Sequence, residues 1–118
     1  MRRYALSAPT SQLSREERLL ELGRAMVAAG HEVEELDPTL SFVASRWVAP
    51  FGNDWRRRFV AVLDTSGSVT LRVEVKICRL FQPCVPLKDE VAPQDLEALD
   101  ALAQEMGRVT QTTATVIP

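Results

Sequence analysis

Two segments of the chain repeat their apolar residues at helical spacing. The first runs from about Ser14 to Ala29, and it begins with the capping-box pattern Ser14-x-x-Glu17 and ends before Gly30. The second begins at Pro93 and is expected to stop at Gly107. The apolar stripes comprise Leu19, Leu22, Met26 and Ala29 in the first segment and Leu96, Leu99, Ala103 and Met106 in the second. The pattern predicts two helices whose apolar faces lie on a flat surface, and whose charged residues, Arg18 among them, face water.

A strict alternation of apolar and polar residues marks the clearest strand, from about Ser68 to Arg79. Its apolar positions predict one buried face, and its charged positions predict one face in water. Upstream, the apolar run Phe59–Leu63 is followed by the turn sequence Asp64–Gly67. Together these segments predict a β-hairpin.

A second hairpin is predicted directly after the first helix, from His31–Leu36 and Leu40–Val48, with a turn at Asp37-Pro38. The buried face of its second strand is ambiguous. Either the pair Val43 and Trp47 or the set Leu40, Phe42 and Val48 could point inward. The segment from Arg2 to Ala8 predicts a further short strand with Tyr4 and Leu6 on one side.

The order of these elements predicts an α+β fold. One strand, one helix, four strands and one helix follow each other with short connections, which suit antiparallel neighbours. We expect a twisted antiparallel sheet of about five strands with both helices packed on one face. Residues 1–107 would form a single domain, and residues 108–118 would form a tail or an edge strand, of which the tail is slightly favoured because few bulky residues are present.

Composition narrows the class of partner. The chain has 118 residues, of which 46% are hydrophobic, and this is enough for one ordinary core. Fourteen Lys and Arg residues stand against sixteen Asp and Glu residues, so the overall basic excess of most nucleic-acid-binding proteins is absent and no nucleic-acid partner is expected. No apolar run approaches the ~20 residues that a membrane-spanning helix needs.

The first residues and the two cysteines bear on the cellular compartment. The sequence MRRYALSAPT has a basic start without the apolar segment of a secretory signal, so we expect either a cytosolic protein or one whose signal has been removed. Cys78 and Cys84 are too few for a structural zinc site. In an oxidising compartment they could close a small disulfide loop with Pro83 bending the chain back, and in the cytosol they would be two thiols.

No arrangement of residues predicts catalysis, a metal site or a cofactor. His31 is the only histidine, and as a residue just beyond a helix it is expected at the surface near the negative helix end. Adjacent carboxylates occur at Glu16-Glu17, Glu34-Glu35 and Asp89-Glu90. Nothing in the pattern places these pairs in an apolar pocket, so we expect a protein that is not an enzyme.

The segment Asn53–Phe59, NDWRRRF, is the candidate partner-binding site. Guanidinium groups of Arg56, Arg57 and Arg58 could bind carboxylates or phosphates, and the indoles of Trp47 and Trp55 could anchor an interface. The alternative is a loop that leads into a strand. In a strand, Arg57 would share one face with Phe59, while Arg56 and Arg58 would share the other, so a single three-armed clamp is not expected.

A family resemblance adds a functional expectation. The first strand ends in Ala-Pro, the first helix closes with AAGHEVE at residues 28–34, and a strand ends in Arg46-Trp47. Over roughly residues 2–106 the chain resembles small bacterial envelope lipoprotein domains, in particular the helix-grip domains of BamC, an outer-membrane-assembly lipoprotein. This resemblance implies a periplasmic or outer-membrane-associated domain that binds proteins without catalysis. The chain lacks the family's lipid-acceptor cysteine, so membrane association would depend on a missing N-terminal lipid anchor.

Three functional hypotheses follow. The leading one is a non-enzymatic protein-binding domain of a bacterial cell-envelope assembly, with contacts at Ala49–Arg58 and around Cys78–Pro86. The second is a cytosolic secretion-chaperone-like or adaptor protein, which would bind a partner segment at a sheet edge or helix groove. The third is a carrier of a small apolar ligand, which would need a large cavity beneath the second helix.

Overall fold

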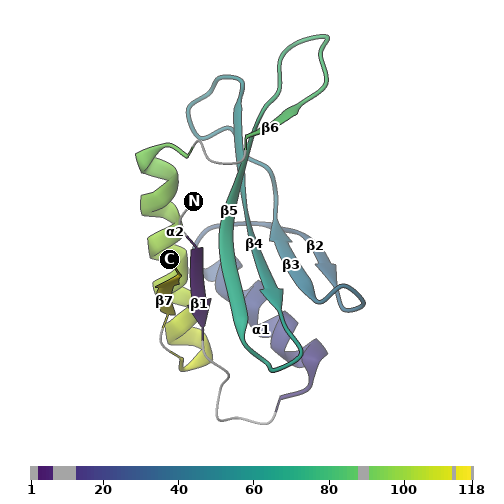
Figure 1. Ribbon diagram of the computed structural model, residues 1–118, viewed down its shortest axis with the longest axis vertical. Coiled ribbons are helices and arrows are strands. Elements are labelled where there is room, and N and C mark those ends of the chain that lie inside the picture. Colours follow the sequence, from purple (N-terminus) through teal and green to yellow (C-terminus); the bar gives the residue numbers. More distant parts are fainter. Residues whose placement is uncertain (1–2, 7–12, 88–90, 113, 118) are drawn as a thin grey trace.

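The computed structural model describes residues 3–6, 13–87, 91–112 and 114–117. The elements in chain order are β1 (Arg3–Leu6), α1 (Arg15–Ala28), β2 (Val33–Asp37), β3 (Phe42–Ser45), β4 (Trp55–Leu63), β5 (Val69–Ile77), β6 (Val85–Leu87), α2 (Pro93–Thr110) and β7 (Ala114–Ile117). The strands form one antiparallel sheet in the order β2-β3-β4-β5-β1-β7, and β6 pairs with β5 outside this path (Figure 1).

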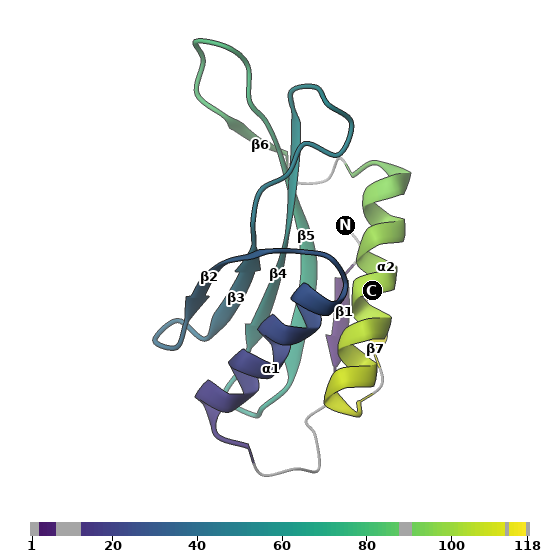
Figure 2. The same ribbon diagram turned by 180° about the vertical axis from the view of Figure 1, so that it is seen from behind.

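Both helices pack on the same face of the sheet. Seen from behind, α1 and α2 lie in front of the strands (Figure 2). They bury apolar stripes against the inward side chains of the central strands, and the resulting core holds Phe59, Leu71 and Val73, each at most 1% exposed. The predicted α+β fold with two helices on one sheet face is therefore confirmed.

The sheet has more strands than the five expected from the sequence. The additional strands are β6, which pairs with the outer half of β5, and β7, which pairs with β1 at the sheet edge. The final segment thus supplies an edge strand, and the slight preference for a tail was wrong. Its β-branched residues need few bulky neighbours because the strand is held by backbone hydrogen bonds to β1.

The predicted ends of α1 and the predicted start of α2 at Pro93 are confirmed, but the predicted end of α2 at Gly107 is not. The Ser14 side chain accepts a hydrogen bond from the Glu17 backbone N–H, and Gly30 adopts φ 90° after the helix. Helix α2 continues through Gly107 to Thr110. Its C-cap residue is Gln111, which has φ 56°.

A buried charge in α1 also differs from expectation. Arg18 is only 3% exposed, although the helical pattern placed it in water. Its guanidinium forms an ion pair with Glu21 at 3.1 Å between Nη1 and Oε1. Burial lowers the pKa of Arg18, and the nearby carboxylate of Glu21 partly offsets this effect.

A bulge at the end of β3, in the second predicted hairpin, decides which way the ambiguous segment Leu40–Val48 faces. Ala44 pairs with Val60, whereas Val48 bridges to Arg57. The three residues 45–47 therefore lie opposite only the two residues 58 and 59, which is a β-bulge. One extra residue reverses the alternation. Val43 therefore lies in the core while Trp47 lies on the opposite face, and neither of the two expected sets points inward as a whole.

Two sequence predictions fall outside the described residues. The outer ends of the first predicted strand and the pair Asp89-Glu90 lie there.

Candidate functional site

The three consecutive arginines point to alternate faces of β4, as the strand pattern predicted. Arg57 shares the helix-covered face with Phe59, and its guanidinium carbon lies 5.6 Å from the centre of that ring. Arg58 lies on the opposite, open face of the sheet, where it contacts Trp47. The arginines thus form no single clamp.

Arg57 and Trp55 are bound to the start of α2 through one buried carboxylate. Asp95 is 0% exposed; it accepts a hydrogen bond from Trp55 Nε1 at 2.9 Å and pairs with Arg57 Nη1 at 3.0 Å. The same carboxylate accepts a bond from the backbone N–H of Ala92 at 3.3 Å, which caps the helix. Two of the five candidate residues therefore fix α2 on the sheet.

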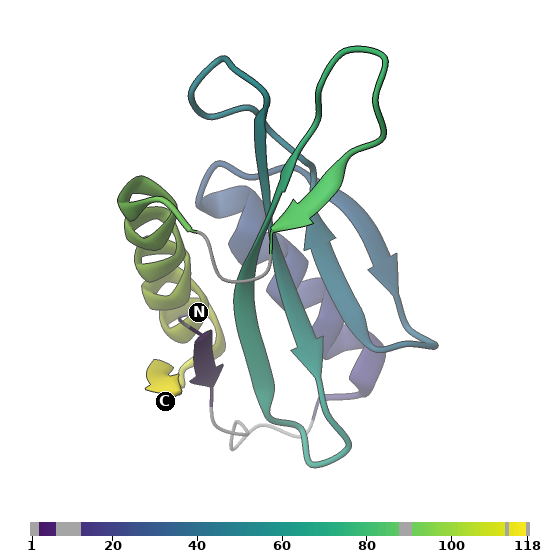
Figure 3. The same cartoon turned by 45° about the horizontal axis from the view of Figure 1, so that its top comes forward.

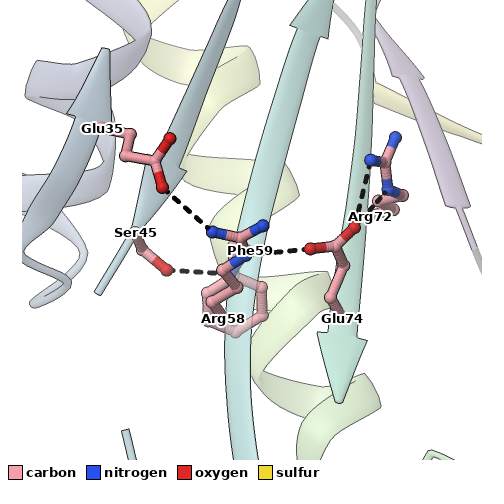
Figure 4. Close-up of polar contacts among 6 residues, drawn as sticks. All are labelled: Glu35, Ser45, Arg58, Phe59, Arg72 and Glu74. Atoms are coloured by element: carbon pink, nitrogen blue, oxygen red, sulfur yellow. Dashed lines mark hydrogen bonds and ion pairs between the residues drawn. The ribbon is translucent and has the colours of Figure 1, made fainter. Parts of the chain in front are cut away.

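Arg58 takes part in an ion-pair network on the open face (Figure 4). Its guanidinium lies between Glu74, at 2.9 Å, and Glu35, at 3.5 Å. Glu74 also pairs with Arg72 at 3.1 Å. Burial of Glu74 raises its pKa, but hydrogen bonds from the two guanidinium groups outweigh burial, and the pKa of Glu74 is lowered overall.

Trp47 completes a groove on this open face. Lys76 Nζ lies 3.9 Å from the centre of its indole ring, and the Arg58 guanidinium carbon lies 4.7 Å from the same centre. The open-face groove has a volume of about 400 Å³. Its lining residues are Trp47, Arg58, Arg72, Glu74, Val75, Lys76, Pro86 and Leu87.

A second feature is the end of the molecule formed by two projecting loops, here called the loop end (residues 49–54 and 78–84; Figures 1 and 3). Cys78 and Cys84 form a disulfide that closes the second loop. The loops are joined by a hydrogen bond of 2.9 Å from the backbone N–H of Cys78 to the backbone oxygen of Asp54. Leu80 is 81% exposed and Phe81 is 97% exposed at the tip of the second loop.

The first loop adds an aromatic contact to the same end. Phe51 is 41% exposed, and its ring centre lies 6.4 Å from that of Trp55. Because Trp55 is tied to Asp95, the base of this loop is fixed to the folded body. Exposed apolar side chains on an anchored loop are typical of contact surfaces.

His31 is not the simple surface residue expected from its place after α1. Its ring packs at 4.7 Å between centres against Phe59. Burial and the nearby charge of Arg57 lower the pKa of His31, whereas a helix C-terminus acting alone would have raised it.

The structure thus divides the predicted site residues into three groups. Trp55 and Arg57 support α2, and Trp47 and Arg58 line the open-face groove. Arg56 bonds back to the backbone oxygens of Asn53 and Trp55 at the start of β4.

Sequence reasoning missed Asp95, Lys76 and the tip pair Leu80 and Phe81 as individual residues. A signal for the tip was present, since two large apolar residues lie between cysteines in a segment that the strand pattern leaves unpaired. No comparable signal marks Asp95, because its partners on β4 lie about forty residues away in the chain.

The fold and these surfaces define a small α+β domain with one open sheet face and a disulfide-closed loop end. No protein-family model matches the chain, and none of the curated proteins compared with it gives a significant match. Within the described ranges, neither helix has the length and apolar character that crossing a lipid bilayer requires.

Proposed function

We propose that the chain is a non-enzymatic protein-binding domain of a bacterial cell-envelope assembly, and that the loop end contacts the partner. The observation that carries this proposal is the near-complete exposure of Leu80 and Phe81 on a loop closed by a disulfide. Large apolar side chains at a loop tip gain free energy when a partner removes them from water.

The disulfide also favours binding for an entropic reason. It joins the two ends of the loop, so the tip has few conformations to lose when it docks. Phe51 on the neighbouring loop is a further exposed apolar side chain, and the Cys78–Asp54 hydrogen bond holds the bases of the two loops together. A partner would therefore meet a preorganised surface of aromatic and aliphatic groups.

The proposed location rests on the same bond and on the resemblance to envelope lipoprotein domains. Disulfides persist in the periplasm and are rare among cytosolic proteins, where thiols are kept reduced. A cystine that shapes an exposed loop is consistent with folding in an oxidising compartment.

The test is photo-crosslinking in cells that naturally make the protein. A photoreactive phenylalanine analogue placed at Phe81 should give a discrete crosslinked product, whereas the same analogue at Glu34, an exposed position on β2, should give none. The product then identifies the partner by mass spectrometry.

A matched pair of substitutions separates specific contact from general stickiness. Leu80→Ser should reduce co-purification of the crosslinked partner by about tenfold or more, because a buried leucine side chain contributes roughly 1.5–3 kcal/mol. Leu40→Ser removes another leucine, 67% exposed, in the turn between β2 and β3, and should leave capture unchanged. Equal capture by both variants would reject the loop end as the contact surface.

A further inference from the structure

The open-face groove carries an unbalanced positive charge. Among the described residues, three cationic side chains, those of Arg58, Arg72 and Lys76, line it together with the carboxylate of Glu74, and Glu35 adds a second carboxylate 3.5 Å from Arg58. Glu74 is already shared by both arginines. In the described part of the chain no carboxylate lies within ion-pair distance of Lys76, and its ammonium group lies over the Trp47 ring.

The register of the central hairpin adds a second charge imbalance at the same place. Arg58 lies directly opposite Glu74, so that cross-strand pair is neutral. Arg56 lies directly opposite Lys76, and like charges in directly opposed positions are destabilising. A negative group bound beside Lys76 would offset this repulsion.

Apolar walls flank the cations. Trp47 forms one wall, brought to this face by the bulge in the β3–β4 pairing, and Pro86 and Leu87 of β6 belong to the other. Arg58 and Lys76 lie over the ring of Trp47, so an apolar surface and two positive charges stand side by side. Such a groove fits a ligand that has both an apolar side chain and a carboxylate.

The position of Glu74 favours a peptide carboxylate over a phosphate. A phosphate dianion in the groove would meet the carboxylate of Glu74, and Arg58 and Arg72 are already bound to that residue. A single peptide carboxylate needs only Lys76 and carries less repulsive charge. The lining side chains of Glu74 and Arg72 are 29% and 36% exposed, so a peptide segment can reach them from solvent without a change in the fold.

We propose that the open-face groove binds an extended acidic peptide segment of a protein partner, with a carboxylate on Lys76 and an adjacent apolar side chain against Trp47. This binding site is separate from the loop end, and it does not depend on the proposed function. The groove would select acidic segments, whereas the loop end, with its apolar tip, would not.

The experiment measures fluorescence anisotropy of a labelled short peptide of alternating leucine and glutamate at low salt. Wild-type protein should bind this peptide and should not bind the matched leucine–lysine peptide. Lys76→Glu should weaken binding by about tenfold or more, the loss expected when one charge-assisted contact becomes repulsive. Arg24→Glu makes the same charge change on the exposed side of α1, outside the groove, and should alter affinity by less than about twofold.

The folding of the variants provides an internal check. Lys76→Glu places a carboxylate opposite Arg56, so its urea midpoint should be equal to or above that of the wild type while its peptide affinity falls. Trp47→Ala should also weaken binding. Equal affinity of the wild type and Lys76→Glu for the acidic peptide, or equal binding of the basic peptide, would overturn the proposal.

Inorganic phosphate serves as the competitor that identifies the ligand class. If phosphate displaces the peptide at concentrations where chloride at equal ionic strength does not, the groove is a small-anion site and the peptide proposal is rejected. Failure of this proposal leaves the loop end untouched, because crosslinking at Phe81 should be the same in the Lys76→Glu variant as in the wild type.

Discussion

At the scale of single residues, the most consequential side chain is Asp95, whose carboxylate accepts hydrogen bonds from three donors in two parts of the chain. Trp55 and Arg57 come from β4, and the Ala92 backbone N–H comes from the start of α2. A buried carboxylate is stable only when such donors replace its hydration. Asp95 therefore joins the sheet to the second helix at one point.

Replacement of this carboxylate should be costly. We expect Asp95→Ala to lower the free energy of unfolding by roughly 3 kcal/mol, because it leaves the largely buried guanidinium of Arg57 without its charge partner and removes the helix cap. Urea denaturation of purified protein measures the change. Glu97→Ala, at an exposed position on the same helix, should change stability by less than about 0.5 kcal/mol. Similar midpoints for the two variants would show that the three contacts contribute little.

Part of this residue-level picture was predictable and part was not. The alternate directions of Arg57 and Arg58 follow from the two-residue period of a strand, and the structure agrees. The direction of Trp47 did not follow, since the bulge that reverses its face depends on the register in which Val48 pairs with Arg57, which the alternation of residue types does not give.

At the scale of elements, the two helical glycines play opposite roles. In α1, a Cβ at Gly23 would lie 3.7 Å from Val33 Cγ2, an ordinary van der Waals distance. In α2, a Cβ at Gly107 would lie 2.8 Å from the backbone oxygen of Thr112, where the chain turns back toward β7. The sequence pattern predicted that Gly107 ends the helix, but its missing side chain instead permits this close approach.

The two alanine substitutions should therefore have opposite signs. Gly23→Ala should raise the free energy of unfolding by about 0.5–1 kcal/mol through helix propensity and the more restricted unfolded chain. Gly107→Ala should lower it by about 1 kcal/mol or more, because backbone must move to accept the methyl group. Thermal or urea unfolding of both variants under one condition is sufficient, and a stabilising Gly107→Ala would contradict the close approach.

Short strands were the elements that the sequence predicted least well. Four-residue strands such as β1 and β7 carry too few alternating positions to fix a register, and their pairing joins segments more than a hundred residues apart. The long helices and the β4–β5 hairpin were predictable because their periodic patterns extend over nine residues or more.

At the scale of the whole molecule, the domain is elongated, with extents of 47 × 26 × 24 Å. The helices and the core occupy one part of this length, and the loop end projects from it (Figure 1). Hydrophobic packing therefore stabilises the body, whereas the tip depends on the disulfide and on short backbone contacts.

Opening the disulfide should be a local event. In the Cys78→Ser/Cys84→Ser double variant, amide hydrogen exchange should accelerate in residues 78–87 and stay slow in residues 69–73, with a loss in stability of at most about 2 kcal/mol. Capture of the loop-end partner should fall because the tip gains conformational freedom.

The same bond tests the proposed compartment. Protein isolated from its own cells with thiols trapped should have a mass lower than the dithiol form by two hydrogen atoms. Free thiols in that protein would reject an oxidising location and favour the cytosolic adaptor.

The pairing of the first and last described strands has a mechanical consequence. Arg3 lies opposite Ile117, and Leu6 lies opposite Ala114. The first residue of β1 and the last residue of β7 are therefore side by side. Tension that separates Arg3 from Ile117 would load the hydrogen bonds of this pair one after another, because antiparallel ladders run perpendicular to their strands. Under force the domain should open at this edge like a zipper, and the nine-residue β4–β5 hairpin would be the last part of the sheet to bear the load.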